Sequence, residues 1–133
     1  MGIKNITETD IELSKVYFTL LVEVSIRQEI ISYGDLVELS KKRYKSKTVQ
    51  KSLTRTTGRR LEVLREHTDT LKLPDISSIV VSKGSTKSGD AYHLDSEKER
   101  KKVYRTHWLN HYCEVIHILD TTLEQIKTIT GCQ

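Results

Sequence analysis

One stretch of the sequence decides the fold: ISYGDLVELSKKRYKSKTVQKSLTRTTGRRLEVLREHTDTL, residues 31–71. A short turn at residues 30–34 precedes a helix predicted over residues 35–44, where apolar residues recur at helical spacing. After a short polar connection, a second helix is predicted over residues 48–71, with Thr48 as its cap. Two helices joined by so short a connection are typical of a helix-turn-helix.

The flanking segments add a helix before this stretch and a hairpin and further helix after it. Apolar residues recur every three or four positions over residues 7–28, which predicts an amphipathic helix capped at Thr7 or Thr9. A β-branched run, a turn rich in Gly, Ser and Lys, and a short return strand predict a β-hairpin over residues 76–94. Residues 96–130 predict a final helix or helix pair.

Helices followed by a hairpin predict a mainly α fold with a β-hairpin (α+β), in the order of a winged helix-turn-helix. We expect a single domain over residues 1–133 with an added C-terminal helix. In this interpretation the helix at 48–71 reads DNA and the hairpin at 76–94 is the wing. The scarcity of turn residues, one proline and six glycines, also favours long helices over a many-stranded sheet.

Composition indicates a chain that folds in a reducing compartment. Two cysteines are too few for a disulfide framework. No apolar run precedes Glu8, which predicts that there is no signal peptide, and the longest apolar stretch, residues 16–24, is too short to span a bilayer. We therefore expect a cytoplasmic protein that does not contact membranes.

The main functional signal is a basic stretch without acids between Glu38 and Glu62. Its cations are Lys41, Lys42, Arg43, Lys45, Lys47, Lys51, Arg55, Arg59 and Arg60. On a continuous helix, Lys51, Arg55 and Arg59 would share one face, and a phosphate backbone would relieve their mutual repulsion. Lys47 and the hydroxyl of Thr48 would add phosphate contacts. The alternative is a solvated basic face that binds nothing.

The tip of the predicted hairpin carries a smaller basic signal. Lys83 and Lys87 flank a turn rich in Gly, Ser and Thr, whose lysines and free amides could hold phosphate. The alternative is an ordinary solvated hairpin tip.

Motifs for catalysis or metal binding are largely absent from the sequence. His107 and His111 have i, i+4 spacing and Cys113 is near, but no second group of ligands completes a metal site. The glycines at 84 and 89 are not followed by the Gly-Lys-Ser/Thr of a P-loop. We therefore expect no catalytic residues, no metal and no cofactor.

An aromatic stripe marks the C-terminal helix. Tyr104, Trp108 and Tyr112 follow one another at i, i+4 spacing. Such stripes usually pack into the core, here over the first helix, and a homodimer seam is the alternative use.

Several short motifs resemble the C-terminal domain of alkylguanine-DNA alkyltransferases and the related alkyltransferase-like proteins. The Ser-Tyr-Gly turn at Ile31–Leu36 and the Arg-x-x-Gly at Arg55–Gly58 are similar to the helix-turn-helix of that family. Further likenesses are Leu73-Pro74 followed by Ile79-Val80-Val81, the Gly-containing segment from Gly84 to Tyr92, and residues 101–109. The resemblance covers roughly residues 15–111.

This resemblance implies a winged helix-turn-helix in which the arginine, Arg55 here, enters the base stack and Gly58 lets helices pack closely. It also implies base flipping by Tyr33 and Arg55. The family's Pro-Cys-His-Arg is replaced by Pro74-Asp75-Ile76-Ser77, so alkyl transfer to a cysteine is impossible at this site.

We therefore expect a non-enzymatic protein that binds duplex DNA. The prediction does not choose between the major and the minor groove. The predicted contacts are Tyr33, Lys47, Thr48, Lys51, Arg55, Arg59, Lys83 and Lys87. The alternative is a small protein-binding inhibitor, such as an immunity or anti-defence protein, that uses the hairpin or the aromatic helix. An enzyme such as a nuclease is disfavoured because no acids or metal ligands cluster.

Overall fold

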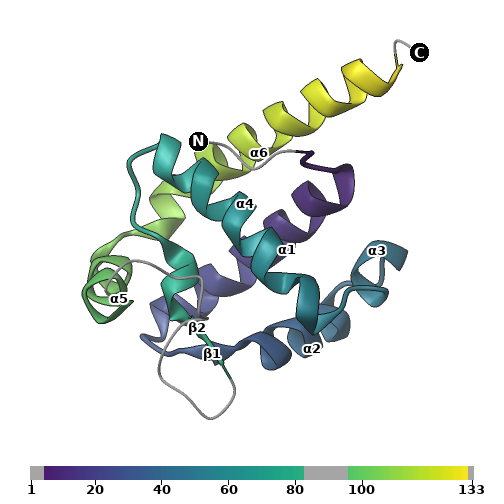
Figure 1. Ribbon diagram of the computed structural model, residues 1–133. Coiled ribbons are helices and arrows are strands. Elements are labelled where there is room, and N and C mark those ends of the chain that lie inside the picture. The colour runs from purple at the N-terminus through teal and green to yellow at the C-terminus, as the bar shows by residue number, and fades with distance from the viewer. Residues whose placement is uncertain (1–4, 83–95, 132–133) are drawn as a thin grey trace.

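The computed structural model describes residues 5–82 and 96–131, and most of them are helical (Figure 1). In chain order the elements are α1 (Glu8–Ile26), β1 (Ile31–Ser32), α2 (Tyr33–Arg43), α3 (Lys47–Gln50), the 3-10 helix η1 (Thr54–Thr56), α4 (Thr57–Thr70), the 3-10 helix η2 (Ile76–Ile79), β2 (Val80–Val81), α5 (Ser96–Arg105) and α6 (Trp108–Gly131). None of the described helices is long and apolar enough to cross a membrane.

Helix α1 forms the centre of the core. It begins at a capping box in which the Thr7 hydroxyl accepts from the Asp10 amide and the Asp10 carboxylate accepts from the Thr7 amide. The predicted amphipathic helix at 7–28 is therefore present, but it is covered on nearly all sides. Helices α2, α3, α4, α5, α6 and η2 all contact it. A helix that is buried all round is a core helix rather than a surface one.

The two strands of the described residues, β1 and β2, form a parallel pair. Ile31 pairs with Val80 and Ser32 with Val81, so the sheet joins segments on either side of α2, α3 and α4. The strand predicted over residues 76–81 is wrong over residues 76–79, because the Asp75 carboxylate accepts from the amide and hydroxyl of Ser77 and closes a 3-10 turn. The rest of the predicted hairpin, residues 83–94, lies outside the described residues.

The single helix predicted over residues 48–71 is also wrong. It is two helices, α3 and α4, separated by an extended Leu53 and by η1. The Ser46 hydroxyl, not Thr48, caps α3, and the Ser52 hydroxyl donates to Val49 O just after α3 ends. Serine and threonine compete for backbone hydrogen bonds in this way and interrupt helices.

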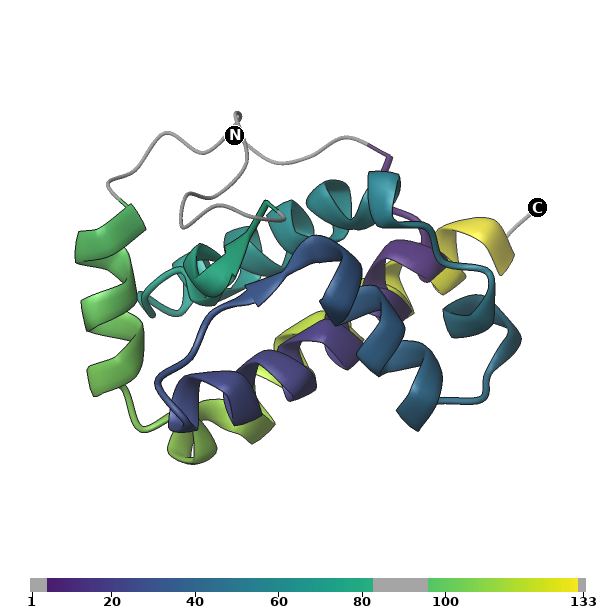
Figure 2. The same cartoon turned by 90° about the horizontal axis from the view of Figure 1, so that it is seen from below.

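The C-terminal segment is a helix pair, α5 and α6, which extends one residue beyond the predicted range of 96–130. Figure 2 shows α6 running along α1, and Figure 1 shows its C-terminal end projecting beyond the other helices. Phe18 of α1 meets Trp108 edge-on at 5.9 Å and stacks on Tyr112 at 5.6 Å. The Tyr112 hydroxyl bonds Thr19 at 2.7 Å, and Tyr104 donates to Glu29 O at 2.7 Å. The aromatic stripe therefore packs over the first helix, as predicted.

Candidate nucleic-acid interface

The basic stretch divides into cations that are neutralised and cations that are not. Arg43 of α2 forms an ion pair with Glu23 of α1. The hydrogen bond from this guanidinium lowers the pKa of Glu23, against the opposing effect of desolvation. Arg59 and Arg60 of α4 both pair with Asp10 of α1. These three arginines therefore tie α1 to its neighbours.

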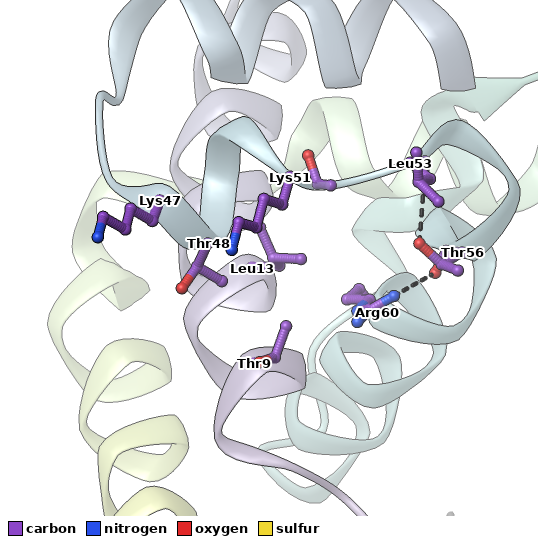
Figure 3. Close-up of a pocket in the computed structure, with 9 residues that line it drawn as sticks. Thr9, Leu13, Lys47, Thr48, Lys51, Leu53, Thr56 and Arg60 are labelled. Carbon is purple, nitrogen blue, oxygen red and sulfur yellow. Dashed lines mark hydrogen bonds between the residues drawn. The ribbon is translucent and has the colours of Figure 1, made fainter.

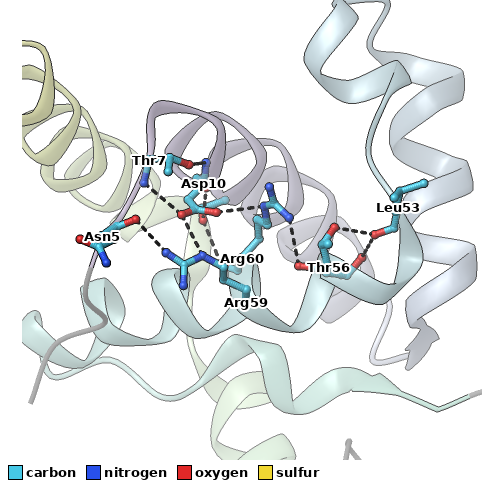
Figure 4. Close-up of polar contacts among 9 residues, drawn as sticks. Asn5, Thr7, Asp10, Leu53, Thr56, Arg59 and Arg60 are labelled. Atoms are coloured by element: carbon cyan, nitrogen blue, oxygen red, sulfur yellow. Dashed lines mark hydrogen bonds and ion pairs between the residues drawn. The ribbon is translucent and has the colours of Figure 1, made fainter. Parts of the chain in front are cut away.

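Asp10 is the centre of a polar network at the first turn of α1 (Figure 4). Its carboxylate receives Arg59 Nε at 3.0 Å and lies 3.1 Å from Arg60 Nε, and only 1% of its side chain is exposed. Arg59 Nη2 also donates to the carbonyl of Asn5 at 2.9 Å. The prediction that Arg59 belongs to an open basic face is therefore wrong, because a carboxylate from another helix neutralises it.

The charges of three cations, Lys47, Lys51 and Arg55, are not neutralised by any described carboxylate. All three are exposed, and within residues 5–82 and 96–131 none of them has a carboxylate partner. Lys51 ends α3 and Arg55 lies in η1, so the predicted i, i+4 spacing on one helix does not hold. The two cations are four positions apart in the chain, which keeps their Cα atoms within about 14 Å of each other.

A cavity of about 310 Å³ opens beside Lys47 and Lys51, between α1, α3 and the start of α4 (Figure 3). Thr48 comes from α3, Lys51 directly follows α3, Thr9 comes from α1 and Arg60 from α4. In the close-up the ammonium of Lys51 lies near Thr48, and Lys47 extends away from the centre. No carboxylate is among the residues that line the cavity. It is therefore a concave site of positive charge with hydroxyl groups around it.

The remaining predicted contacts lie apart from this cavity. Tyr33 begins α2, is half-buried and packs against the core, whereas Lys47 and Lys51 follow the other end of that helix. Eleven residues of α-helix span about 16 Å. Lys83 and Lys87 lie outside the described residues. The structure thus brings together Lys47, Thr48 and Lys51 from the predicted set.

Gly58 does not have the role that the sequence suggested. It is the second residue of α4 rather than the middle of a long helix. A Cβ atom placed on it would meet nothing within 4 Å. The expected close packing of helices at this glycine is therefore wrong.

The sequence prediction did not assign Thr9, Asp10 or Arg60 to the site, although it counted Arg60 in the basic stretch and named Thr9 as a possible cap. The signal for Asp10 was present: helical spacing puts it on the same face as Leu13, Ser14 and Tyr17, all of which are buried. A carboxylate on a core face needs a cationic partner, because burying an unpaired charge is costly. The adjacent arginines of the basic stretch were the available partners.

Other clusters of reactive side chains are few in the part of the chain that the structure describes. It contains no group of three or more His, Cys, Asp or Glu residues able to hold a metal ion. His111 Nδ1 instead contacts Glu114 Oε1 one helical turn along α6, at 2.7 Å. Cys113 is exposed.

Comparisons with known proteins do not identify a relative. No family model matches the chain, and neither a curated protein nor a solved structure matches it. The likeness to alkyltransferase-like proteins stays a prediction from short motifs.

Proposed function

We propose that this chain is a non-enzymatic module that binds duplex DNA through Lys47, Lys51 and Arg55. The observation that carries the proposal is that these cations are exposed and lack carboxylate partners among the described residues, although other arginines of the same stretch are paired. Cations held near one another repel, and a phosphate backbone relieves that repulsion. Binding also releases condensed counterions, which favours the complex at low salt.

Within this proposal, Arg55 is the side chain that reaches the bases. The resemblance to alkyltransferase-like proteins implies that an arginine at this position enters the base stack. The 3-10 helix η1 supports this role because it exposes Arg55 close to the phosphate-binding lysines. Tyr33 has a smaller part, since it packs against the core. Lys83 and Lys87 are included as DNA contacts of a wing, and only the sequence supports their inclusion.

Salt dependence provides the test. We expect the affinity for a random duplex, measured by fluorescence anisotropy, to weaken roughly 40-fold between about 50 and 200 mM salt if three cations each contact one phosphate. A variant with Lys51→Ala and Arg55→Ala should bind more weakly and lose about two units of the log–log salt slope.

The matched control removes the same charge elsewhere. Lys101 and Arg105 are exposed on α5, which lies at the opposite end of the molecule from α3 (Figure 1). Lys101→Ala with Arg105→Ala should leave most of the affinity. Equal losses in the two double variants would show that only net charge matters, and the proposed interface would then be wrong.

The protein-binding alternative has less support from the described surface. The aromatic side chains of α6 that were candidates for docking pack against α1. Leu109 and Ile129 are each 70% exposed on α6, but twenty residues of helix separate them by about 30 Å, so they form no shared patch for a partner or a second copy. A failure to bind DNA at any salt concentration would favour the inhibitor hypothesis over DNA binding.

A further inference from the structure

The cavity between α1, α3 and α4 carries more positive charge than the nearby carboxylates neutralise. Asp10 lies behind Arg60 and shares one negative charge between Arg59 and Arg60, which leaves one positive charge in that group. Lys51 adds a second at the cavity wall. Glu8 and Glu12, the described acids two residues on either side of Asp10, do not line the cavity, and Glu12 accepts a hydrogen bond from the Ser46 hydroxyl.

The cavity also offers hydrogen-bond donors without acceptors. The hydroxyls of Thr9 and Thr48 have no hydrogen-bond partner within the described ranges. Arg60 uses Nε toward Asp10 and Nη1 toward Thr56 O, at 3.3 Å, and no described acceptor lies on its Nη2. Lys51 contributes an ammonium with three donors.

Donors of this kind suit one class of ligand. Phosphate oxygens accept several hydrogen bonds at once, and ammonium, guanidinium and hydroxyl groups are their usual partners in proteins. The donors come from three helices, so a bound tetrahedral anion would be held from several sides.

We propose that this cavity is a binding site for one phosphate group, held by Lys51, Thr48, Thr9 and Arg60. The proposal deepens the proposed function and rests on it for the source of the phosphate: a phosphodiester of the DNA backbone or a phosphomonoester at a DNA end. The site itself depends only on the chemistry of the cavity.

The test follows backbone amide signals of the ¹⁵N-labelled full chain during titration with inorganic phosphate. We expect saturable shifts at Thr48, Lys51, Ser52 and Arg60, and no saturation with sodium chloride at matched ionic strength. Shifts that do not saturate, or that chloride reproduces, overturn the site.

Two variants separate specific binding from general charge. Thr48→Val keeps the size of the side chain and removes its hydroxyl, and Lys51→Gln removes the ammonium. We expect at least a tenfold loss of phosphate affinity for Lys51→Gln and a smaller loss for Thr48→Val. Lys45→Gln removes the same charge at an exposed position that does not line the cavity. A loss at Lys45→Gln as large as at Lys51→Gln overturns the proposal.

Titrations with DNA then test the phosphate site separately from the DNA-binding function. They also identify whether the bound phosphate comes from the DNA backbone or from a DNA end. Duplexes with 5′-phosphate and with 5′-hydroxyl ends compete against inorganic phosphate in the same spectra. Stronger competition by the phosphorylated ends assigns the site to a phosphomonoester, and equal competition assigns it to the backbone. Saturation by phosphate without any DNA binding supports the site and overturns the DNA function. DNA binding that weakens in Lys51→Gln but is unchanged in Thr48→Val, without phosphate saturation, overturns the site and leaves the function.

Discussion

At the scale of single residues, Asp10 makes several of the polar contacts that join α1 to α4. Its carboxylate caps its own helix through the Thr7 amide and also holds two guanidinium groups of α4. It is almost completely buried, whereas Arg59 is 40% exposed and can regain water. Removing the carboxylate therefore leaves Arg60 as the main uncompensated charge, since that side chain is only 15% exposed.

We expect Asp10→Asn to lower the free energy of unfolding by about 2–3 kcal/mol, because a partly buried guanidinium loses its counter-charge. Urea unfolding measures this as a shift of the midpoint at constant slope. Asp69→Asn is the matched control, since Asp69 is exposed near the end of α4, and it should stay within about 0.5 kcal/mol of wild type. If the two variants behave alike, the Asp10 network does not stabilise the fold.

At the scale of elements, the break between α3 and α4 shows what periodicity misses. Between Val49 and Leu61 the buried positions are Ser52 and Thr57 rather than large apolar residues, and Leu53 points outward. Counting apolar residues at helical spacing therefore joined two helices across a polar junction. The density of Ser and Thr at 46–57 was the available sign, because these side chains bond nearby backbone groups.

Other elements were predictable because their signals are strong and local. The capping motif at Thr7 and the long periodic stretch of α1 predicted that helix closely. The same holds for α2, whose observed start at Tyr33 differs by two residues from the prediction. Pairing of β1 with β2, and of Asp10 with α4, depends on contacts between distant residues, which no local pattern contains.

The contact between α1 and α2 gives a prediction about pH. The lowered pKa of Glu23 means that the native carboxyl binds a proton less readily than the unfolded one. The stabilisation is therefore complete above the ordinary glutamate pKa of 4.5 and is lost as the pH falls through the lower native pKa. We expect Glu23→Gln to lower the free energy of unfolding by at most about 1 kcal/mol near pH 7, because the ion pair is largely exposed. Near pH 2 the substitution should have no effect, because the wild-type carboxyl is then protonated.

Urea unfolding of wild type and Glu23→Gln across this pH range is the measurement. Glu38→Gln, at an exposed position of α2 without an ion pair to any described residue, is the control and should show no such convergence. A difference between Glu23→Gln and wild type that persists unchanged to low pH contradicts the role of the ion pair.

At the scale of the whole molecule, the body of the protein is organised around α1, and α6 contributes only one face to it. Trp108 is 1% exposed and donates its Nε1 hydrogen to Val103 O at 2.9 Å, whereas the next residue, Leu109, is 70% exposed. Adjacent positions on one helix therefore have opposite environments. The aromatic contacts to Phe18 join the two longest helices of the described structure.

We expect Trp108→Ala to lower the free energy of unfolding by about 3–5 kcal/mol, because it removes a large buried ring and leaves a cavity. Leu109→Ala should change it by less than about 0.5 kcal/mol, since the side chain is in solvent. Thermal unfolding followed by circular dichroism compares the two. Similar melting temperatures would mean that α6 does not pack on α1 as described.

The small parallel sheet sets an order of events for the chain. Ile31 and Val80 lie on either side of α2, α3 and α4, so closing that loop costs conformational entropy for only two residue pairs of ladder. The helices gain hydrogen bonds locally and on faster timescales. Folding should therefore complete the strand pair last, and during native-state fluctuations the amides of β1 and β2 should exchange with deuterium before those of α1.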